Sequence, residues 1–327
     1  MSQFNVLSIL QKHFSDPALT KLEVVQSLWS GYGEIARFVS PKLQQSVIVK
    51  HINPHVSDNH PRGWNTQSSH LRKLQSYQIE LAFYQDFAPL CDLHCTVPKL
   101  LGSFTHESEQ ILVLTDLDTK GFAQRKSEVT HQDVQQGVKW LAYFHACFIQ
   151  RANKGLWPIG TYWHLATRQD EYKAMPDSEL KQHAEQIDYL LNTAKFKTLL
   201  HGDAKLANFC FADDPQREQL AAVDFQYVGS GVGVKDLAYF LGSCLSNNDL
   251  KAFSDSIVMS YFAHLKDALK HYHVQLDTLA LEQEWRGLYC FAWADFQRFL
   301  LGWSPEHYKL NSYMQEQTEL ALEKLAS

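Results

Sequence analysis

Two aspartates and an asparagine stand at fixed offsets from two short apolar runs in the middle of the chain. Asp203 follows the run Thr198–Leu200, and Asn208 comes five residues after it. Asp224 directly follows the run Leu220–Val223. Any one of these side chains alone is better explained as a turn residue. As a set they favour phosphoryl transfer, in which one Asp accepts a hydroxyl proton while an Asn and a second Asp hold magnesium.

The spacing of this set resembles known kinase motifs. His201-x-Asp203-x4-Asn208 resembles the H-R-D-x4-N catalytic loop, with Gly202 in place of Arg. The segments LHGDAKLANFC and AVDFQ also resemble the signatures of the aminoglycoside phosphotransferase, choline kinase and ecdysteroid kinase-like group of small-molecule kinases. The resemblance implies a protein-kinase-like fold, Asp203 as the catalytic base, and Asn208 with Asp224 as Mg²⁺ ligands.

Other residues of the same region have supporting roles in this interpretation. Lys205 could neutralise charge on the transferring phosphoryl group, although a solvated loop lysine is nearly as good an explanation. His201 is expected to hold the loop backbone. Asp236 is predicted to be the N-cap of the next helix, and the resemblance implies that it anchors the catalytic loop. The glycine-rich run at residues 228–233 is predicted to be a flexible loop.

Near the N-terminus, a β-rich run is followed by Gly31 and Gly33 and then by a second β-rich run. Strand, glycine turn and strand is the layout of a loop that covers nucleotide phosphates. A plain hairpin turn would use the same residues. The third glycine of the protein-kinase loop is absent, so the sequence does not decide whether this loop binds phosphate.

The next predicted strand ends in Lys50, and a later helix carries Glu80 among aromatic and aliphatic residues. A carboxylate on such a face needs a cation, and Lys50 is the candidate. The alternatives are a lysine and a glutamate that each face solvent. Ile48 lies on the same strand face as Lys50 and would cover the adenine ring. Asp116 and Leu117 resemble the hinge that holds adenine through main-chain groups.

The elements that must position these residues indicate an α+β chain with two lobes. We expect a small β-rich N-lobe over residues 1–117, which ends at the hinge, and a larger, mainly helical C-lobe over residues 118–327. Residues 51–69 are predicted to be a long flexible connection, and residues 308–325 a closing helix. The aromatic helix before that one carries three candidate acceptor-site residues, Trp293, Asp295 and Arg298.

Composition narrows the range of partners. A net charge of −6 argues against a nucleic-acid partner, and no run of uncharged apolar residues is long enough to span a membrane. The N-terminus lacks signal-peptide features, which predicts a cytoplasmic protein. Six cysteines form no recognisable disulfide or zinc framework. No protein partner is implied.

The leading hypothesis is an ATP- and Mg²⁺-dependent kinase that phosphorylates a hydroxyl group of a small molecule. A protein kinase is disfavoured, because only a short segment separates Asp224 from Asp236 and no long activation segment fits there. The alternative is a catalytically silent nucleotide-binding protein, a pseudokinase, which only the shortened glycine loop supports. The sequence does not identify the acceptor, and ATP is the default nucleotide.

Overall fold

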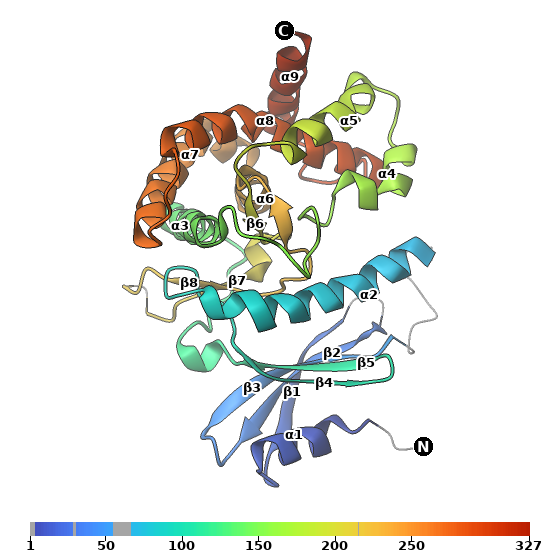
Figure 1. Ribbon diagram of the computed structural model, residues 1–327, viewed down its shortest axis with the longest axis vertical. Coiled ribbons are helices and arrows are strands. Elements are labelled where there is room, and N and C mark those ends of the chain that lie inside the picture. Colours follow the sequence, from blue (N-terminus) through green and yellow to red (C-terminus); the bar gives the residue numbers. More distant parts are fainter. Residues whose placement is uncertain (1–3, 29–30, 55–66, 215) are drawn as a thin grey trace. The chain divides into compact units, whose positions relative to one another are not determined.

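The computed structural model describes residues 4–28, 31–54, 67–214 and 216–327 (Figure 1). Contacts within the chain divide it into two compact units. The first unit comprises residues 1–89, 97–124 and 212–217, and the second unit comprises residues 90–96, 125–211 and 218–327. The predicted lobes, with their division after residue 117, differ from these units in the three short segments 90–96, 118–124 and 212–217.

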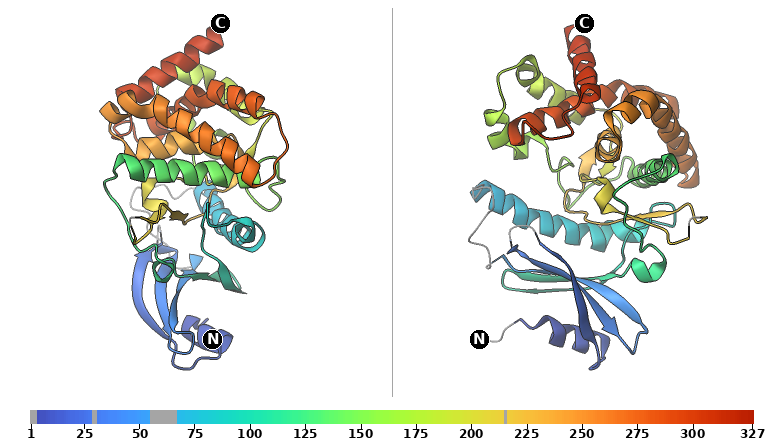
Figure 2. Two further views of the ribbon diagram at one scale, coloured as in Figure 1. Left: turned by 90° about the vertical axis from the view of Figure 1, so that its left-hand side faces the viewer. Right: turned by 180° about the vertical axis from the view of Figure 1, so that it is seen from behind.

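The first unit is built on a five-stranded antiparallel sheet with the strand order β1-β2-β3-β5-β4. The helices of this unit lie on opposite faces of the sheet (Figures 1 and 2). Its elements are α1 (Val6–Phe14), β1 (Thr20–Ser27), β2 (Gly33–Ser40), β3 (Gln45–Ile52), α2 (Gln67–Ala82), a π-helical turn (Phe83–Phe87), β4 (Leu100–His106) and β5 (Glu109–Thr115).

Alternation along β3 decides which side chains reach the core and which reach the opposite face. Val47 and Val49 are at most 1% exposed and pack in one cluster with Leu10 of α1. Ile48 and Lys50 therefore point to the other face, because successive side chains of a strand alternate. That face carries α2, as the predicted pairing of Lys50 with a carboxylate requires.

The connection predicted over residues 51–69 is shorter than expected at both ends. β3 continues through Ile52, and α2 begins at Gln67. The ladder of β3 continues because His51 pairs with both neighbouring strands, opposite Glu34 and Ile111. Residues 55–66 of the prediction lie outside the described part of the chain.

The second unit is mainly helical, as predicted, with two short strand pairs. α3 and α7 lie side by side along most of their length (Figure 2). Its named elements are α3 (His131–Phe148), α4 (Gln169–Ala174), α5 (Glu179–Asn192), β6 (Thr198–Leu200), β7 (Phe209–Phe211), β8 (Leu220–Ala222), β9 (Gly229–Gly231), α6 (Val234–Cys244), α7 (Asn247–His271), α8 (Thr278–Trp303) and α9 (Ser312–Ala326).

Local sequence signals set the ends of several of these helices. Thr130 and Asp133 form a reciprocal capping box at the start of α3. The side chain of Asn311 accepts a hydrogen bond of 3.0 Å from the backbone N–H of Met314. This cap starts α9 at Ser312, so the predicted start of the closing helix at residue 308 is wrong. Residues 308–311 form part of the loop before α9.

The prediction of a flexible loop at residues 228–233 is also wrong. Gly229–Gly231 forms β9, which pairs antiparallel with β6, the strand that precedes Asp203. A side chain at Gly229 would place a Cβ 2.5 Å from the main-chain oxygen of Trp157. The glycines there permit close packing of backbone against backbone, which composition alone does not distinguish from flexibility.

The helices of the described ranges include none that combines the length and the apolar character needed to cross a bilayer.

Candidate active site

The carboxylate of Asp203 lies at the end of β6 and accepts hydrogen bonds from three side chains. Tyr239 Oη donates to Oδ1 at 3.0 Å, while Lys205 Nζ and Asn208 Nδ2 donate to Oδ2 at 3.1 and 3.2 Å. Asp203 is 6% exposed. Burial raises the pKa of Asp203, Lys205 lowers it, and the nearby carboxylate of Asp224 raises it. The net upward shift makes Asp203 a stronger proton acceptor than an exposed carboxylate.

Asn208 and Asp224 share the neighbourhood of Asp203. Asn208 Nδ2 also donates to the main-chain oxygen of Asp203 at 2.8 Å, and Asn208 accepts through its own main-chain oxygen from Val223 N. This last bond connects the loop that carries Asp203 to the residue before Asp224. The three side chains that the sequence separates are therefore close together in the second unit, as the sequence analysis expected.

Asp224 is held in an unusual backbone conformation. Its φ of 70° is in the left-handed region, which a non-glycine residue seldom adopts. Gln226, at the position of the glycine in Asp-Phe-Gly, donates from Nε2 to Asp224 Oδ1 at 2.6 Å. The main-chain oxygen of Gln226 in turn accepts from the indole of Trp157 at 2.9 Å. The replacement of glycine thus gives the carboxylate a positioning partner.

Asp236 anchors the backbone of the loop that carries Asp203. Its two carboxylate oxygens accept from His201 N at 2.6 Å and from Gly202 N at 3.0 Å. His145 Nε2 lies 3.2 Å from the same carboxylate, and no part of either side chain is exposed. The prediction of Asp236 as an N-cap is wrong, because α6 begins at Val234 and Gly233 holds the cap position. Within the first turn, the carboxylate faces the loop instead of its own helix.

The His-Gly-Asp segment is fixed from both sides. The fully buried His201 ring bonds to Val223 O at 3.0 Å and to Asp203 N at 3.3 Å, which agrees with the expected loop-holding role. Burial lowers the pKa of His201. Gly202 has a φ of 80°, and a Cβ there would lie 2.1 Å from Tyr227 O. An arginine at this position, as in protein kinases, has no room.

Lys205 combines a contact to Asp203 with access to solvent. Its side chain is 40% exposed. Burial opposes the charged form of Lys205, but the carboxylates of Asp203 and Asp224 outweigh it and raise the pKa of the amine. Lys205 therefore stays protonated beside the carboxylate of Asp203. The alternative of a purely solvated lysine does not describe this geometry.

In the first unit, Lys50 and Glu80 form the predicted ion pair. Lys50 Nζ lies 2.6 Å from Glu80 Oε2, and both side chains are at most 5% exposed. The ring of Tyr77 lies below the amine, with 5.6 Å from Nζ to the ring centroid. The alternative of two solvent-facing side chains is thereby excluded.

The two glycines of the predicted phosphate loop have left-handed backbones, with φ of 72° at Gly31 and 127° at Gly33. A Cβ at Gly33 would lie 2.0 Å from His51 O, so the approach of β2 to β3 requires glycine. Ile48, opposite Leu114 of β5, is half-buried on the face that also carries Lys50. A phosphate contact of the loop stays a prediction.

The predicted hinge residues have well-defined structural contacts. Asp116 is 2% exposed, accepts from Arg37 Nε at 2.7 Å and also accepts from the hydroxyl of Ser46. Leu117 O accepts from the backbone N–H groups of Lys120 and Phe122, each at 3.0 Å. These contacts fix the segment after β5. Adenine binding by its main chain stays a prediction.

The three acceptor-site candidates on α8 are at most 1% exposed. Asp295 lies 2.7 Å from Arg298 Nη2 and 2.9 Å from Lys235 Nζ. Burial would raise the pKa of Asp295, but these two cations hold it well below its usual range. Trp293 packs against Tyr313, with 5.3 Å between the ring centroids. All three side chains thus have contacts in the protein core. A direct contact between them and an acceptor stays a prediction.

Sequence reasoning did not single out Tyr239 or Lys309, which both belong to the surroundings of Asp203. Tyr239 follows Asp236 by three residues in α6, a spacing that puts both on one helix face. That spacing was an available signal. The sequence predicted that Lys309 lies in the closing helix, and no pattern in the sequence indicated that it belongs to the surroundings of Asp203.

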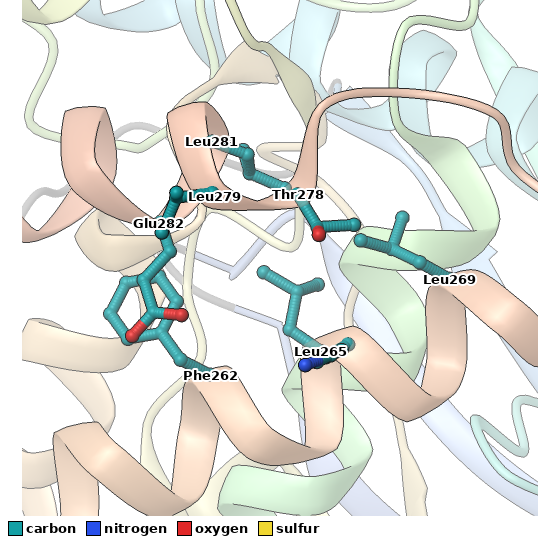
Figure 3. Close-up of a pocket in the computed structure, with 8 residues that line it drawn as sticks. Phe262, Leu265, Leu269, Thr278, Leu279, Leu281 and Glu282 are labelled. Atoms are coloured by element: carbon teal, nitrogen blue, oxygen red, sulfur yellow. The ribbon is translucent and has the colours of Figure 1, made fainter.

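A separate small hollow lies between the end of α7 and the start of α8 (Figure 3). None of the predicted site residues lines it. Its lining residues are Phe262, Leu265, Lys266, Leu269, Thr278, Leu279, Leu281 and Glu282.

The fold and the arrangement around Asp203 define the class of protein-kinase-like small-molecule kinases. Residues 40–157 and 160–274 match the ecdysteroid kinase-like family, and the chain belongs to that family. No curated protein sequence matches the chain.

Two solved structures are similar over nearly the whole chain. A microcompartment-associated aminopropanol kinase has a TM-score of 0.52 at 14% identity, covering 96% of this chain and 94% of the other. The GDP complex of wild-type aminoglycoside 2′-phosphotransferase-IIIa has a TM-score of 0.50 at 10% identity, covering 99% and 98%. At such low identities these likenesses establish the fold, an α+β small-molecule kinase fold.

Proposed function

We propose that the chain is an ATP- and Mg²⁺-dependent kinase that transfers the γ-phosphoryl group to a hydroxyl of a small molecule. The observation that carries the proposal is the buried carboxylate of Asp203, oriented by Tyr239, Lys205 and Asn208 beside Asp224. Membership of the ecdysteroid kinase-like family supports it. The identity of the nucleotide and the acceptor is part of the proposal.

Asp203 is the proposed general base. One oxygen of its carboxylate accepts from Tyr239, and the other accepts from Lys205 and Asn208, so the group cannot rotate freely. A hydroxyl that meets this carboxylate would give up its proton as its oxygen bonds to the γ-phosphorus, while the bond from that phosphorus to the β–γ bridging oxygen breaks and ADP leaves. Lys205, which stays protonated, neutralises charge that develops on the transferring group.

The residues next to Asp203 fit magnesium. The amide nitrogen of Asn208 is used by Asp203, whereas its oxygen accepts no hydrogen bond from the described residues. That oxygen and the carboxylate of Asp224 are hard ligands of the kind Mg²⁺ prefers. Asp203 and Asp224 also repel each other, a cost that a bound cation would relieve. When bound, the ions would neutralise the phosphate charges and leave proton acceptance to Asp203.

The nucleotide-binding residues of the proposal belong to the first unit. Lys50, positioned by Glu80, would pair with the α- and β-phosphates, as the buried ion pair supports. Gly31 and Gly33 would approach the phosphates through their backbone, and Ile48 would cover the adenine. The main chain at Asp116 and Leu117 would hold the adenine edge. On the acceptor side, the proposal retains a wall formed by Trp293, Asp295 and Arg298.

Incubation with ATP, Mg²⁺ and a panel of alcohols, with ADP release as the signal, tests this function. Asp203→Asn should lower kcat by about 10²- to 10⁴-fold while ATP binding by calorimetry stays normal. Asp177→Asn is a matched control, since that side chain is 99% exposed. If ATP binds but ADP is released with none of the alcohols, the result would favour the pseudokinase alternative. Near-normal turnover of Asp203→Asn would reject the assigned base.

A further inference from the structure

Lys309 is a buried lysine that has no carboxylate partner in the part of the chain that the structure describes. It lies in the loop between α8 and α9 and is 6% exposed. Lysine is almost never buried unless it is paired, because the charge loses its hydration. Within the described ranges, no carboxylate oxygen lies within 4.0 Å of its ammonium group, and Nζ donates no hydrogen bond to these residues. Such a cation calls for an explanation.

Three aromatic rings surround this ammonium group. Nζ lies 4.5 Å from the ring centroid of Tyr239, 5.6 Å from that of Phe296 and 6.0 Å from that of Tyr308. Cation–π contacts hold a charge in place but use none of its three N–H donors. The ammonium group is therefore positioned and still able to bind an acceptor of hydrogen bonds.

The aromatic rings around Lys309 connect it to the surroundings of Asp203. The Tyr239 ring that underlies Lys309 is the same ring whose hydroxyl bonds to Asp203. Burial lowers the pKa of Lys309 to about 8, Asp203 acts to raise it and Lys205 acts to lower it. At neutral pH the amine is mainly protonated. Asp203 thus has two lysine ammonium groups in its surroundings, Lys205 and Lys309.

We propose that Lys309 binds a negatively charged group, a carboxylate or an oxoacid ester, of the alcohol whose hydroxyl meets Asp203. This inference rests on the proposed kinase function and names its substrate class. An anion would supply the partner that Lys309 lacks among the described residues. A cationic alcohol would instead bring a third positive charge next to Lys205 and Lys309. The two structurally similar kinases are named for amines, and their low identity carries no acceptor preference over to this chain.

Matched alcohols that differ only in charge test the proposal. One set is glycerate, glycerol and 3-amino-1,2-propanediol, and a second set is benzyl alcohol with a carboxylate, a methyl or an aminomethyl group on the ring. ADP release and thermal shift in the presence of ATP and Mg²⁺ are measured for the wild type, Lys309→Met, Lys309→Arg and Lys270→Met. Methionine keeps the length and apolar contacts of Lys309. Lys270, with a side chain 69% exposed, is the matched control.

In the wild type, the anionic member of a set should be preferred over the cationic member in kcat/KM or in thermal shift. Lys309→Met should lower kcat/KM for the anionic member about 10- to 100-fold, with little change for the neutral member. Lys309→Arg should retain part of the preference, and Lys270→Met all of it. Equal effects of Lys309→Met on all members, or a preferred cation, would overturn the proposal.

The thermal-shift measurement separates this inference from the proposed function. If ADP is released with none of the alcohols, the proposed kinase function is rejected. The preference for an anion is then decided from the binding measurement alone. Stabilisation of the wild type by the anionic members that is lost in Lys309→Met would then support the anion site. Absence of any charge-dependent shift would reject it.

Discussion

The hydroxyl group of Tyr239 donates a hydrogen bond of 3.0 Å to Oδ1 of Asp203. Tyr239 belongs to α6, and Asp203 follows β6, so the bond joins two elements that the chain separates by 36 positions. Both residues are buried. A carboxylate that is held at both of its oxygens keeps one orientation, which the proposed general base requires.

Tyr239→Phe removes this donor but keeps the ring beneath Lys309. A hydrogen bond to a charged group contributes about 1.5–3 kcal/mol, so kcat should fall about tenfold or more while the Kd for ATP is unchanged. The pKa of Asp203 should rise further, which moves the acidic limb of the kcat profile to higher pH. Tyr189→Phe, at a ring 65% exposed, is the control. A normal kcat with an unshifted pH profile would contradict this assignment.

The hydrogen bonds of Asp236 to the loop that carries Asp203 should contribute to the free energy of unfolding. Asp236→Ala removes the acceptor of the backbone N–H groups of His201 and Gly202 and the partner of His145 Nε2. Loss of one partner in a buried network costs about 3–5 kcal/mol. Denaturant unfolding should show this decrease in the free energy of unfolding, together with a lower kcat.

The matched control is Asp267→Ala, whose side chain is 65% exposed and pairs with Lys270 at 3.4 Å. An exposed pair of this kind contributes at most about 1 kcal/mol. Equal losses for Asp236→Ala and Asp267→Ala would show that the loop does not depend on its buried anchor.

Much of the site could be predicted because its spacing follows from local geometry. Asp203 and Asn208 belong to one loop, so five positions suffice to describe their contact. The Lys50–Glu80 pair was predictable because a lone carboxylate on an apolar helix face requires a cation. In each case, a rule about burial or spacing connects residue types to a contact.

Other features depend on tertiary contacts that the sequence does not encode locally. Glycines at residues 229–231 indicated a loop, yet β9 exists because β6 supplies its hydrogen-bond partner. Asp236 has the spacing of a cap, but the backbone N–H groups that it binds come from a loop more than 30 positions earlier. The position of Lys309 over Tyr239 depends on where the loop before α9 returns to α6.

The Lys50–Glu80 pair predicts non-additive stability effects. Lys50→Met and Glu80→Leu alone should each cost about 3–5 kcal/mol, because each removes one member of a buried ion pair. The double variant should regain most of this loss, since it removes both members of the pair. It should nevertheless bind ATP much more weakly than the wild type. A stable double variant with normal ATP affinity would remove Lys50 from the nucleotide site.

The control for this cycle is the exposed pair Lys21–Glu34, with side chains 38% and 35% exposed. Its single variants should change the free energy of unfolding by less than about 1 kcal/mol. Additive losses in the buried cycle would contradict the expected coupling.

A buried histidine predicts how stability depends on pH. His164 is 6% exposed, and its Nε2 lies 3.6 Å from Oδ1 of Asp188. Burial lowers the pKa of His164 from 6.5 to about 4, with a further decrease from Lys235 and Arg298. The native state therefore keeps this ring neutral over a range in which the unfolded state binds a proton.

Because the unfolded state binds more protons between these pKa values, stability falls as the pH falls from about 6.5 to about 4, by about 3 kcal/mol for this group. Below that range, both states are protonated and the loss stops. The raised pKa of Asp188, caused by burial first, acts in the opposite direction.

His164→Gln should therefore flatten the dependence of the unfolding free energy on pH, measured by urea unfolding at several pH values. His131→Gln, at an exposed ring, should leave the wild-type slope unchanged. The comparison of slopes is independent of any constant loss that glutamine causes in packing, because such a loss shifts all pH values equally. An unchanged slope in His164→Gln would show that this ring takes up its proton in the folded protein as readily as in the unfolded chain.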